Sequence, residues 1–370
     1  MPLDVRPLDA AAHRAFVEER SASFLQLPSW GGVKAEWGRL SLGWYDNDRL
    51  VGAGLVLLRR TPKVERYLAY LPEGPVVDWQ TYGVADVLDP LTLLLKQHKV
   101  FAVKIGPQEI VRRWSATTVK DAIAAGTVRR LGDVPPDVEN PDALGLTGAL
   151  RAAGWKQARD TGSGFGDVQP RYVFQVPLTG RDEAGVLAGF NQLWRRNIKK
   201  AEKSGVEVSL GSREDLAEFH RVYVVTAARD GFTPRPLGYL ERMWDAMQAE
   251  DPDRLRLYLA RHDGEVLAAT TAVRSGRHVW YSYGASADHK REVRPSNAIQ
   301  WAMIRGALEV GADVYDLRGI SDTLDPDDPL FGLIQFKLGT GGEAVEYVGE
   351  WDYPLNPLLY KAFTAYLERR

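Results

Sequence analysis

Apolar and polar positions along the chain form blocks that predict strands and helices in a recurring order. In the first half, Leu42–Arg60 predicts two strands joined by an Asp-Asn-Asp turn, because two apolar stretches flank three residues that favour tight turns. A helix is predicted over Val84–His98 and a strand over Val100–Gly106. The predicted order in this half is therefore hairpin, helix, strand.

The second half repeats this order. Leu255–Arg274 predicts a hairpin around a His-Asp-Gly turn, and Val279–Gly284 predicts a further strand. A helix is predicted over Ser296–Val310, followed by a strand over Asp313–Leu317. The repeated order indicates two copies of one unit and predicts a mixed α/β fold.

The size of the chain also favours two domains. Its 370 residues exceed what one hydrophobic core usually supports. The segment Leu131–Gly148 is rich in proline, glycine and acidic residues and is a candidate boundary. The tract Thr161–Pro170 predicts a mobile loop, and no heptad pattern predicts a coiled coil.

Composition and motifs exclude several classes of site. A formal net charge of −2 gives no global positive field, so any RNA contact must come from a local patch. The absence of cysteine excludes disulfides, thiolate metal sites and a cysteine nucleophile. Six scattered histidines lack metal-ligand spacing and are predicted to be surface or loop residues. We expect no metal site, and no P-loop, dinucleotide-binding, zincin or nucleophile-elbow motif occurs.

Targeting signals are not evident either. The first residues carry acids where a signal peptide needs an apolar core, and the longest apolar run, Leu50–Leu58, is far shorter than a membrane span. We expect a soluble, cytoplasmic protein. Peripheral contact with the inner face of the membrane is left open.

The loop before the predicted helix Ser296–Val310 lacks the glycines that would indicate a coenzyme A site. In acyltransferases with this strand–loop–helix order, the loop normally carries glycines that cradle the pyrophosphate of coenzyme A at the helix N-terminus. Here the loop is Ala287–Asn297, ADHKREVRPSN, and it has no glycine. The sequence thus predicts an acyl-transfer scaffold that uses a donor other than coenzyme A.

A basic stripe is the strongest charge feature. The helix predicted over Asn191–Lys203 places Trp194 on one face and five cations on the other. These cations are Arg195, Arg196, Lys199, Lys200 and Lys203. A run of charge is commonly a solvated face, but like charges at i,i+4 repel, so a bound anion would stabilise the stripe. Both a solvated face and a phosphate track remain open at this point.

Three further side chains are candidates for chemistry. Lys337 ends the apolar segment Phe331–Lys337, which predicts a strand; its ammonium either extends to solvent or lies in a pocket, where it could stabilise an oxyanion. Tyr281 and Tyr283 alternate along one predicted strand and so are predicted to share a face. They would line a groove or pack against a helix.

Five segments together resemble the Fem (FemABX) family of peptidoglycan bridge-forming aminoacyltransferases, and the resemblance covers nearly the whole chain. The segments are Gln26–Gly38, Arg195–Val206, Tyr223–Arg235, Tyr281–Ile320 and Phe331–Gly342. The resemblance implies two tandem acetyltransferase-like (GNAT) domains, with the C-terminal segment returning to the first. We therefore expect one domain from residues 1–147 with 348–370, and a second from residues 148–347. The chain is similar to the short members that lack a coiled-coil insertion.

The resemblance also implies the reaction. Family members use aminoacyl-tRNA as donor, with no further cofactor, and the acceptor is an amine on the third stem-peptide residue of a peptidoglycan precursor. Because the donor is already an ester, positioning and one oxyanion stabiliser could suffice. By resemblance, Lys337 would stabilise the oxyanion, Lys34 and Arg229 would hold the precursor's diphosphate, and Tyr283 would line the precursor groove, with Tyr281 beside it. The basic stripe is our candidate for the tRNA site.

One departure from the family leaves alternatives open. The first-domain strand ends in KIGPQ, Lys104–Gln108, where relatives often carry an acid in place of Gly106. The role of that acid would then lie elsewhere, or the acceptor would differ. The alternatives are transfer to another amine and a non-catalytic module that binds tRNA or muropeptide; an acyl-CoA transferase would instead be stabilised by coenzyme A. Sequence does not determine the transferred amino acid (glycine, alanine or serine) or the acceptor residue (lysine or diaminopimelate). It also does not determine the precursor (lipid II or UDP-MurNAc-pentapeptide) or the oligomeric state.

Overall fold

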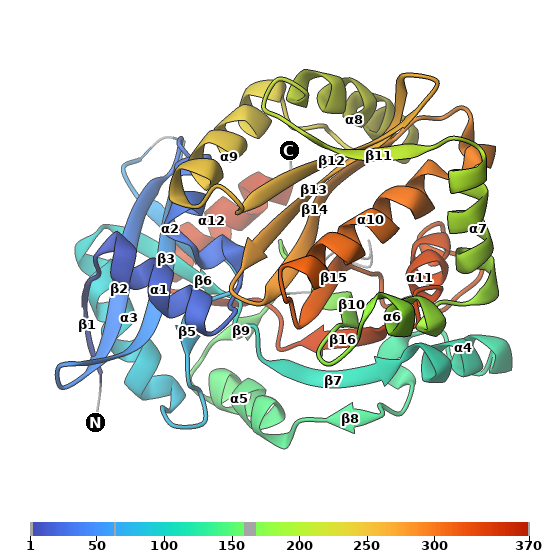
Figure 1. Cartoon of the computed structure of the whole chain (residues 1–370). Coiled ribbons are helices and arrows are strands. Elements are labelled where there is room, and N and C mark those ends of the chain that lie inside the picture. The colour runs from blue at the N-terminus through green and yellow to red at the C-terminus, as the bar shows by residue number, and fades with distance from the viewer. Residues whose placement is uncertain (1–2, 63, 159–167, 369–370) are drawn as a thin grey trace. The chain divides into compact units, whose positions relative to one another are not determined.

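The computed structural model describes residues 3–62, 64–158 and 168–368, and the chain forms two compact units (Figure 1). Unit 1 comprises residues 1–113, 136–172 and 345–370, and unit 2 comprises residues 114–135 and 173–344. The expected boundary at 147/148 falls inside helix α5 (Pro141–Ala152), so residues 148–172 belong to unit 1. Most of the loop predicted over Thr161–Pro170 lies outside the described residues.

Unit 1 is built on a mixed sheet with the strand order β1–β2–β3–β4–β6–β17–β9, with β5 beside β3. Only β4 and β6 pair in parallel within this order. The strands are β1 (Asp4–Pro7), β2 (Gly38–Asp46), β3 (Arg49–Arg60), β4 (Tyr67–Leu71), β5 (Val76–Val77), β6 (Val100–Ile105), β9 (Lys156–Gln157) and β17 (Trp351–Pro354). The predicted first hairpin is confirmed as β2 and β3, with Asn47 in the left-handed region at the turn.

Helices cover the sheet of unit 1 and close its core. They are α1 (Ala10–Glu19), α2 (Pro28–Val33), α3 (Val84–Gln97), α5 and α12 (Pro357–Glu368), with a short 3-10 turn η1 (Phe24–Gln26). The helix predicted over 84–98 is confirmed as α3, which packs against β6. Helix α12 also packs on β6, where the ring of Phe363 meets that of Phe101 edge to face at 5.3 Å.

His13 on α1 corrects a prediction. We expected surface or loop histidines, but His13 is fully buried and its Nδ1 lies within hydrogen-bond distance of the Ser41 hydroxyl. Helix α1 follows the N-cap Asp9, whose carboxylate accepts the N–H groups of Ala11 and Ala12. This register buries His13 with Phe16 and Val17. The spacing of the histidines in the sequence does not show that the imidazole of His13 lies on the apolar face of α1.

Unit 2 is built on a second mixed sheet, within which the strand order is β11–β12–β13–β14–β15–β10. The strands are β10 (Tyr172–Pro177), β11 (Glu207–Gly211), β12 (Leu255–His262), β13 (Glu265–Ser275), β14 (His278–Ser286) and β15 (Val314–Gly319). Strands β7 (Ile110–Ser115) and β16 (Glu343–Tyr347) contain residues of both units, and β7 pairs with β8 (Val138–Glu139). The second predicted hairpin is confirmed as β12 and β13, and the following strands as β14 and β15.

Several helices of unit 2 pack on its sheet, and others pack on neighbouring helices. They are α4 (Ala116–Ala125), α6 (Glu183–Gly189), α7 (Gln192–Lys203), α8 (Leu216–Asp230), α9 (Leu237–Glu250), α10 (Pro295–Glu309) and α11 (Phe331–Leu338), with 3-10 turns η2 (Leu131–Asp133) and η3 (Arg291–Val293). Helix α8 packs on β13 and β14, and α10 packs on β12 and β13. The predicted helix over 296–310 is confirmed as α10.

The segment Phe331–Lys337 corrects a second prediction, because it is helix α11 and not a strand. Its buried positions are Phe331, Ile334, Lys337 and Leu338, which follow the three-to-four-residue spacing of a helix. Alternation and helical spacing are hard to distinguish in so short an apolar run. The helical geometry places Lys337 on the buried face.

Two kinds of feature are absent from the described residues. None of the helices in the described ranges is both long and apolar enough to cross a membrane. Across the same ranges, no group of three or more histidine or carboxylate side chains could hold a metal ion.

Candidate active site

Lys337 lies at the centre of the candidate site in unit 2. Its side chain reaches from α11 to the end of β15, and the residue is 5 % exposed. The Nζ atom donates to the carbonyl oxygens of Leu317 at 2.8 Å, Arg318 at 3.1 Å and Gly319 at 2.6 Å. A protonated lysine has three donors, so all of them are used by three consecutive carbonyls.

The environment brings the pKa of Lys337 into the physiological range. Burial lowers this pKa from 10.5 to about 7, the charge of Asp316 opposes the change, and the guanidinium of Arg318 adds to it. Near pH 7 the amine can therefore exist in its charged or its neutral form. A perturbed lysine of this kind, buried beside specific charges, is typical of functional sites.

Asp316 supports the same turn from inside the sheet. It is fully buried; its Oδ2 accepts from Gln175 Nε2 at 3.0 Å and lies 3.5 Å from His278 Nε2, while its Oδ1 accepts the N–H of Arg318 at 2.6 Å. Burial opposes ionisation of Asp316, but the hydrogen bond and charge of His278 together with Arg318 hold its pKa below the usual value. The imidazole of His278 stacks on Trp280 at 3.8 Å, which fixes its orientation.

The two parallel strands β14 and β15 separate at this point. Their paired residues run from His278 with Val314 to Trp280 with Asp316, and β14 then continues to Ser286. Such carboxyl ends of parallel strands are where α/β proteins commonly bind ligands. The Lys337 site therefore lies where the sheet opens.

The tyrosines of β14 lie at a register irregularity of that strand. This irregularity places one additional residue of β14 opposite β13 between Tyr281 and Gly284. Tyr283 donates to the hydroxyl of Tyr239 at 3.3 Å and packs edge to face on Tyr223. Both tyrosines lie at the open end of β14 and near Tyr223 of α8: Tyr283 packs on its ring, and Tyr223 helps to raise the pKa of Tyr281.

Tyr281 is packed over the backbone of β14. A Cβ atom on Gly284 would lie 1.8 Å from the Tyr281 hydroxyl oxygen, so glycine is required at 284 for the ring to lie there. Burial raises the pKa of Tyr281 to about 12, with Tyr223 and Asp230 adding to the shift. Tyr281 is therefore a neutral hydroxyl at physiological pH.

Arg229 lies at the end of β14. Its Nε and Nη2 donate to the carboxylate of Asp230 at 2.7 and 3.0 Å, and its Nη1 donates to the Ser286 carbonyl at 3.1 Å. Thr226, one turn earlier on α8, exchanges hydrogen bonds with the backbone of the same serine. The guanidinium is 30 % exposed and thus remains accessible to an anion. Because β14 and β15 are neighbours, Arg229, the tyrosines and Lys337 belong to one edge of the sheet of unit 2.

Lys34 lies in unit 1, at the C-terminal end of α2. Its residue is partly buried and its ammonium is 5.1 Å from the ring centroid of Trp30. This contact holds the stem of Lys34 on α2.

Two buried carboxylates flank Gly106 in unit 1, and sequence reasoning missed both. A Cβ atom on Gly106 would lie 3.2 Å from Cγ of Glu350 and 3.5 Å from the backbone nitrogen of Glu73. Glu350 is 2 % exposed, accepts from the Tyr70 hydroxyl at 2.5 Å, and lies 3.8 Å from Lys104 Nζ. Acids inside apolar segments, YLPEG and VGEWD, were the signal that could have revealed them.

Glu73, which lies beside Gly106, contacts a residue in the wall of a cavity. Its Oε2 accepts from the Ser23 hydroxyl and from Gln108 Nε2 at 3.1 Å. Gln108 is also part of the wall of a cavity of ≈ 490 Å³ in unit 1. Its polar lining includes Gln108, Glu109, Arg112, Arg113, Glu139 and Asn140. Burial and the charge of Asp78 raise the pKa of Glu109, so this carboxyl group is protonated more readily than an ordinary glutamate.

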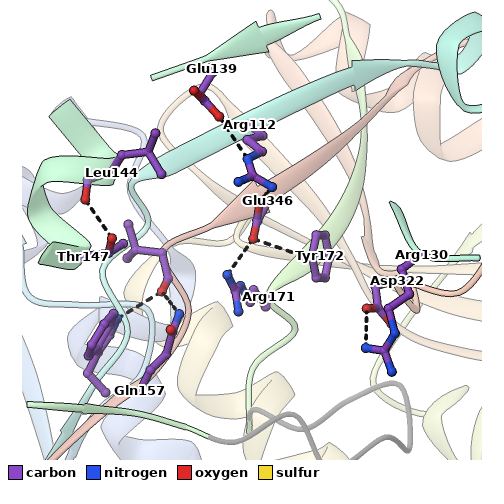
Figure 2. Close-up of polar contacts among 12 residues, drawn as sticks. Arg112, Arg130, Glu139, Leu144, Thr147, Gln157, Arg171, Tyr172, Asp322 and Glu346 are labelled. Carbon is purple, nitrogen blue, oxygen red and sulfur yellow. Dashed lines mark hydrogen bonds and ion pairs between the residues drawn. The ribbon is translucent and has the colours of Figure 1, made fainter. Parts of the chain in front are cut away.

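A third buried carboxylate in unit 1 is neutralised by arginines. Glu346 is 2 % exposed, accepts from Arg171 Nη2 at 2.7 Å and from the Tyr172 hydroxyl at 3.1 Å, and lies 3.6 Å from Arg112 Nη1 (Figure 2). Arg112 also donates to Glu139 at 3.2 Å. These paired charges stabilise β7, β8 and β16, and we assign Glu346 no part in the candidate site.

The basic stripe is present as predicted on α7. The five cations at positions 195, 196, 199, 200 and 203 are exposed, whereas Trp194 and Ala201 are buried. Asn191 caps the helix by accepting the N–H of Trp194. The stripe thus faces solvent, which both a solvated face and a phosphate track require.

Comparisons with known proteins agree with this architecture. A profile described as the FemAB family matches residues 8–263 and 255–368. A lipid II:glycine glycyltransferase of Staphylococcus saprophyticus is 25 % identical, covering 95 % of this chain and 92 % of the relative. A UDP-N-acetylmuramoylpentapeptide-lysine N(6)-alanyltransferase of Weissella viridescens is 28 % identical, covering 90 % and 89 %. Both named relatives are aminoacyltransferases.

Solved structures confirm the predicted fold. A crystal structure of FemX superposes with a TM-score of 0.80 at 23 % identity, covering 97 % of this chain and 99 % of that one. A tandem GNAT protein from the clavulanic acid biosynthesis pathway superposes with a TM-score of 0.52 at 12 % identity, covering 96 % and 99 %. The mixed α/β architecture and its GNAT-like character are therefore as expected.

Proposed function

This chain belongs to the FemAB family, and on that premise we propose that it transfers an amino acid from an aminoacyl-tRNA to a peptidoglycan precursor. The acceptor is the side-chain amine of the third stem-peptide residue, in lipid II or UDP-MurNAc-pentapeptide. The observation that carries the proposal is the buried Lys337 at the open end of β14 and β15, in a chain whose relatives named above transfer glycine or alanine. No coenzyme A takes part.

The reaction is aminolysis of an ester. The acceptor nitrogen attacks the carbonyl carbon, a C–N bond forms, and a tetrahedral oxyanion develops. The bond to the ribose oxygen then breaks, the acceptor nitrogen loses a proton, and the ribose hydroxyl is protonated. In its charged form Lys337 stabilises the oxyanion, and it does so by exchanging one of its three carbonyl contacts for the substrate oxygen.

The acceptor amine is oriented by carboxylates in unit 1. An amine must be deprotonated to attack, and a nearby carboxylate can hold it and take up its proton. Glu73 and Glu350 flank Gly106, where a Cβ atom would lie only 3.2 Å from Cγ of Glu350. They therefore take the role of the acid that relatives often carry in place of Gly106. Lys34 and Arg229 bind the precursor's diphosphate, and Tyr283 and Tyr281 line its groove.

The basic stripe of α7 binds the phosphates of the tRNA. Its five exposed cations lie along one face of a single helix, which suits the charged backbone of an RNA helix. Anions offset the mutual repulsion of charges spaced at i,i+4.

We expect the double variant Arg195→Ala/Lys199→Ala to weaken tRNA binding and to reduce its salt dependence. Each lost phosphate contact lowers the slope of log K against log salt by about 0.7–0.9, so the pair should lower it by about 1.5. Filter binding from low to moderate salt measures the slope. The control Lys120→Ala/Arg221→Ala removes two exposed cations from α4 and α8 and should leave the slope unchanged. Equal slopes for wild type and the α7 variant would remove this helix from the tRNA site.

Arg229→Met should raise KM for the precursor by about 10- to 100-fold, because a charge-assisted contact to phosphate is lost. Kinetics with the intact precursor and with an analogue that lacks the diphosphate measure the effect. If Arg229 binds the diphosphate, the variant and wild type should use the analogue equally poorly. An equal loss with both substrates would place Arg229 elsewhere.

The central test is transfer of a labelled amino acid from a charged tRNA pool to purified precursor, in both its nucleotide-linked and its lipid-linked form. RNase-sensitive label in either precursor supports the proposal and identifies donor and acceptor. Label in another amine would indicate a related transferase. Binding of tRNA without any transfer would indicate a binding module, and thermal stabilisation by coenzyme A would indicate an acyl-CoA enzyme.

A further inference from the structure

We propose that Arg318 is a second cation, beside Lys337, that binds an anionic oxygen of the donor substrate, and that Lys337 also holds the turn that presents Arg318. This inference rests on the proposed acyl transfer and adds a residue to it. The anionic oxygen is a phosphate oxygen at the acceptor end of the tRNA or the oxyanion of the tetrahedral intermediate. Both present the same chemistry to a guanidinium.

The backbone of Arg318 is the first observation. Its φ is +62°, in the left-handed region that side chains other than glycine, asparagine and aspartate rarely adopt. In this turn the N–H of Arg318 is held by the carboxylate of Asp316, two residues earlier in the chain. A strained residue of this kind persists only where its surroundings fix it, and such residues gather at functional sites.

The contacts of the turn show what fixes it. Asp316 accepts the N–H of Arg318 at 2.6 Å, while Lys337 binds the carbonyl oxygens of residues 317, 318 and 319. Asp316 is 0 % and Lys337 is 5 % exposed. Burying two charged side chains is costly unless they are well paired. Both of them engage this one short turn, so its conformation is strongly specified.

Before substrate binds, the ammonium of Lys337 is fully engaged with the turn that carries Arg318. All three protons of the Lys337 ammonium are donated to backbone carbonyls, so in this conformation none is directed at a substrate. Arg318 is partly exposed, and its guanidinium lies close enough to influence the ionisation of both Asp316 and Lys337. An arginine also keeps its charge at every working pH.

The position of Arg318 agrees with a substrate contact. Pairing between β14 and β15 ends at Trp280 and Asp316, and Arg318 lies two residues beyond that point. It therefore stands at the carboxyl edge where the two parallel strands diverge. This is also the edge to which Tyr283 and Arg229 belong.

Arg318→Gly tests the proposal, because glycine adopts the same φ without strain but has no guanidinium. We expect kcat/KM for transfer to fall about 100-fold, as for loss of one preorganised donor, with a Tm no lower than that of wild type. Arg318→Lys keeps a charge and should recover part of the rate. Lys99→Gly is the matched control: Lys99 is an exposed cation with φ +58° in unit 1, outside the proposed site, and its replacement should leave transfer unchanged.

The measurements distinguish a phosphate contact from an oxyanion contact, and failure of the Arg318 assignment from failure of the proposed function. A raised KM and Kd for tRNA would identify a phosphate contact, and a lowered kcat with unchanged Kd would identify the oxyanion. Unchanged transfer in Arg318→Gly would overturn the inference alone, as would a lower Tm, which would give Arg318 a structural role. If wild type transfers nothing, the proposed function fails, and an unchanged Kd for tRNA in Arg318→Gly then overturns the inference as well.

Discussion

Replacing Lys337 with methionine is expected to lower kcat/KM for aminoacyl transfer by roughly 100- to 1000-fold, the cost of removing one oxyanion stabiliser. Methionine keeps the apolar stem within α11 but removes the donor that meets three carbonyl groups at the end of β15. The turn that presents Arg318 would lose its anchor as well, so both cations would be affected. Steady-state kinetics of labelled transfer measure the loss. Lys120→Met, which replaces an exposed lysine on α4, is the matched control and should leave kcat/KM unchanged.

The pH dependence distinguishes charge from structure at Lys337. Because its pKa is lowered to about 7, the charged form is present below pH 7 and is lost as the pH rises through 7. Wild-type kcat/KM should therefore fall on the alkaline side of pH 7 through this group. In Lys337→Arg the side chain stays charged, so any residual activity should lack this alkaline fall. An alkaline fall near pH 7 that persists in Lys337→Arg would show that another group titrates there.

Acidification from pH 7 to pH 4 is expected to cost about 3 kcal/mol of unfolding free energy through His13. Burial lowers the pKa of His13 from 6.5 to about 4, although its proximity to the backbone of Gln26 acts in the other direction. Between these values the unfolded chain binds a proton that the folded chain does not. The contribution is therefore fully present above pH 6.5 and is lost as the pH falls towards 4. Urea unfolding across this range measures it.

His13→Asn provides the comparison, since its amide can replace the Nδ1 contact to Ser41 and does not titrate. The variant should be less stable than wild type at pH 7 but should lose less stability on acidification. His98→Asn, at an exposed position after α3, should follow wild type at every pH. Parallel acid dependence in wild type and His13→Asn would show that the loss comes from other groups.

Local patterns predicted much of the fold, because they depend on neighbouring residues. The two hairpins, helices α3 and α10, and the strands that follow them were all found where periodicity and turn residues placed them. Helix α11 was missed because an apolar run of eight residues fits both a helix and a buried strand. The register irregularity between Tyr281 and Gly284 was not predicted, because a bulge depends on the partner strand.

The candidate site was predicted less completely. Sequence identified Lys337, Arg229 and the tyrosines through family resemblance, but it did not show whether the lysine was buried. It also missed Glu73 and Glu350, which approach Gly106 from distant parts of the chain. Their convergence depends on the sheet order of unit 1, in which β17 lies beside β6.

By itself the sequence determined the repeated α/β order, the glycine-free loop before α10, the basic face of α7 and the motifs of the FemAB family. Each of these depends on residues close together in the chain, whose periodicity and turn preferences are local properties. Only the tertiary structure decided that Lys337 meets three carbonyls, that Arg318 is held in a left-handed turn, and that His13 is buried. Burial and ionisation depend on groups brought together from distant segments, and that convergence is a property of the folded chain.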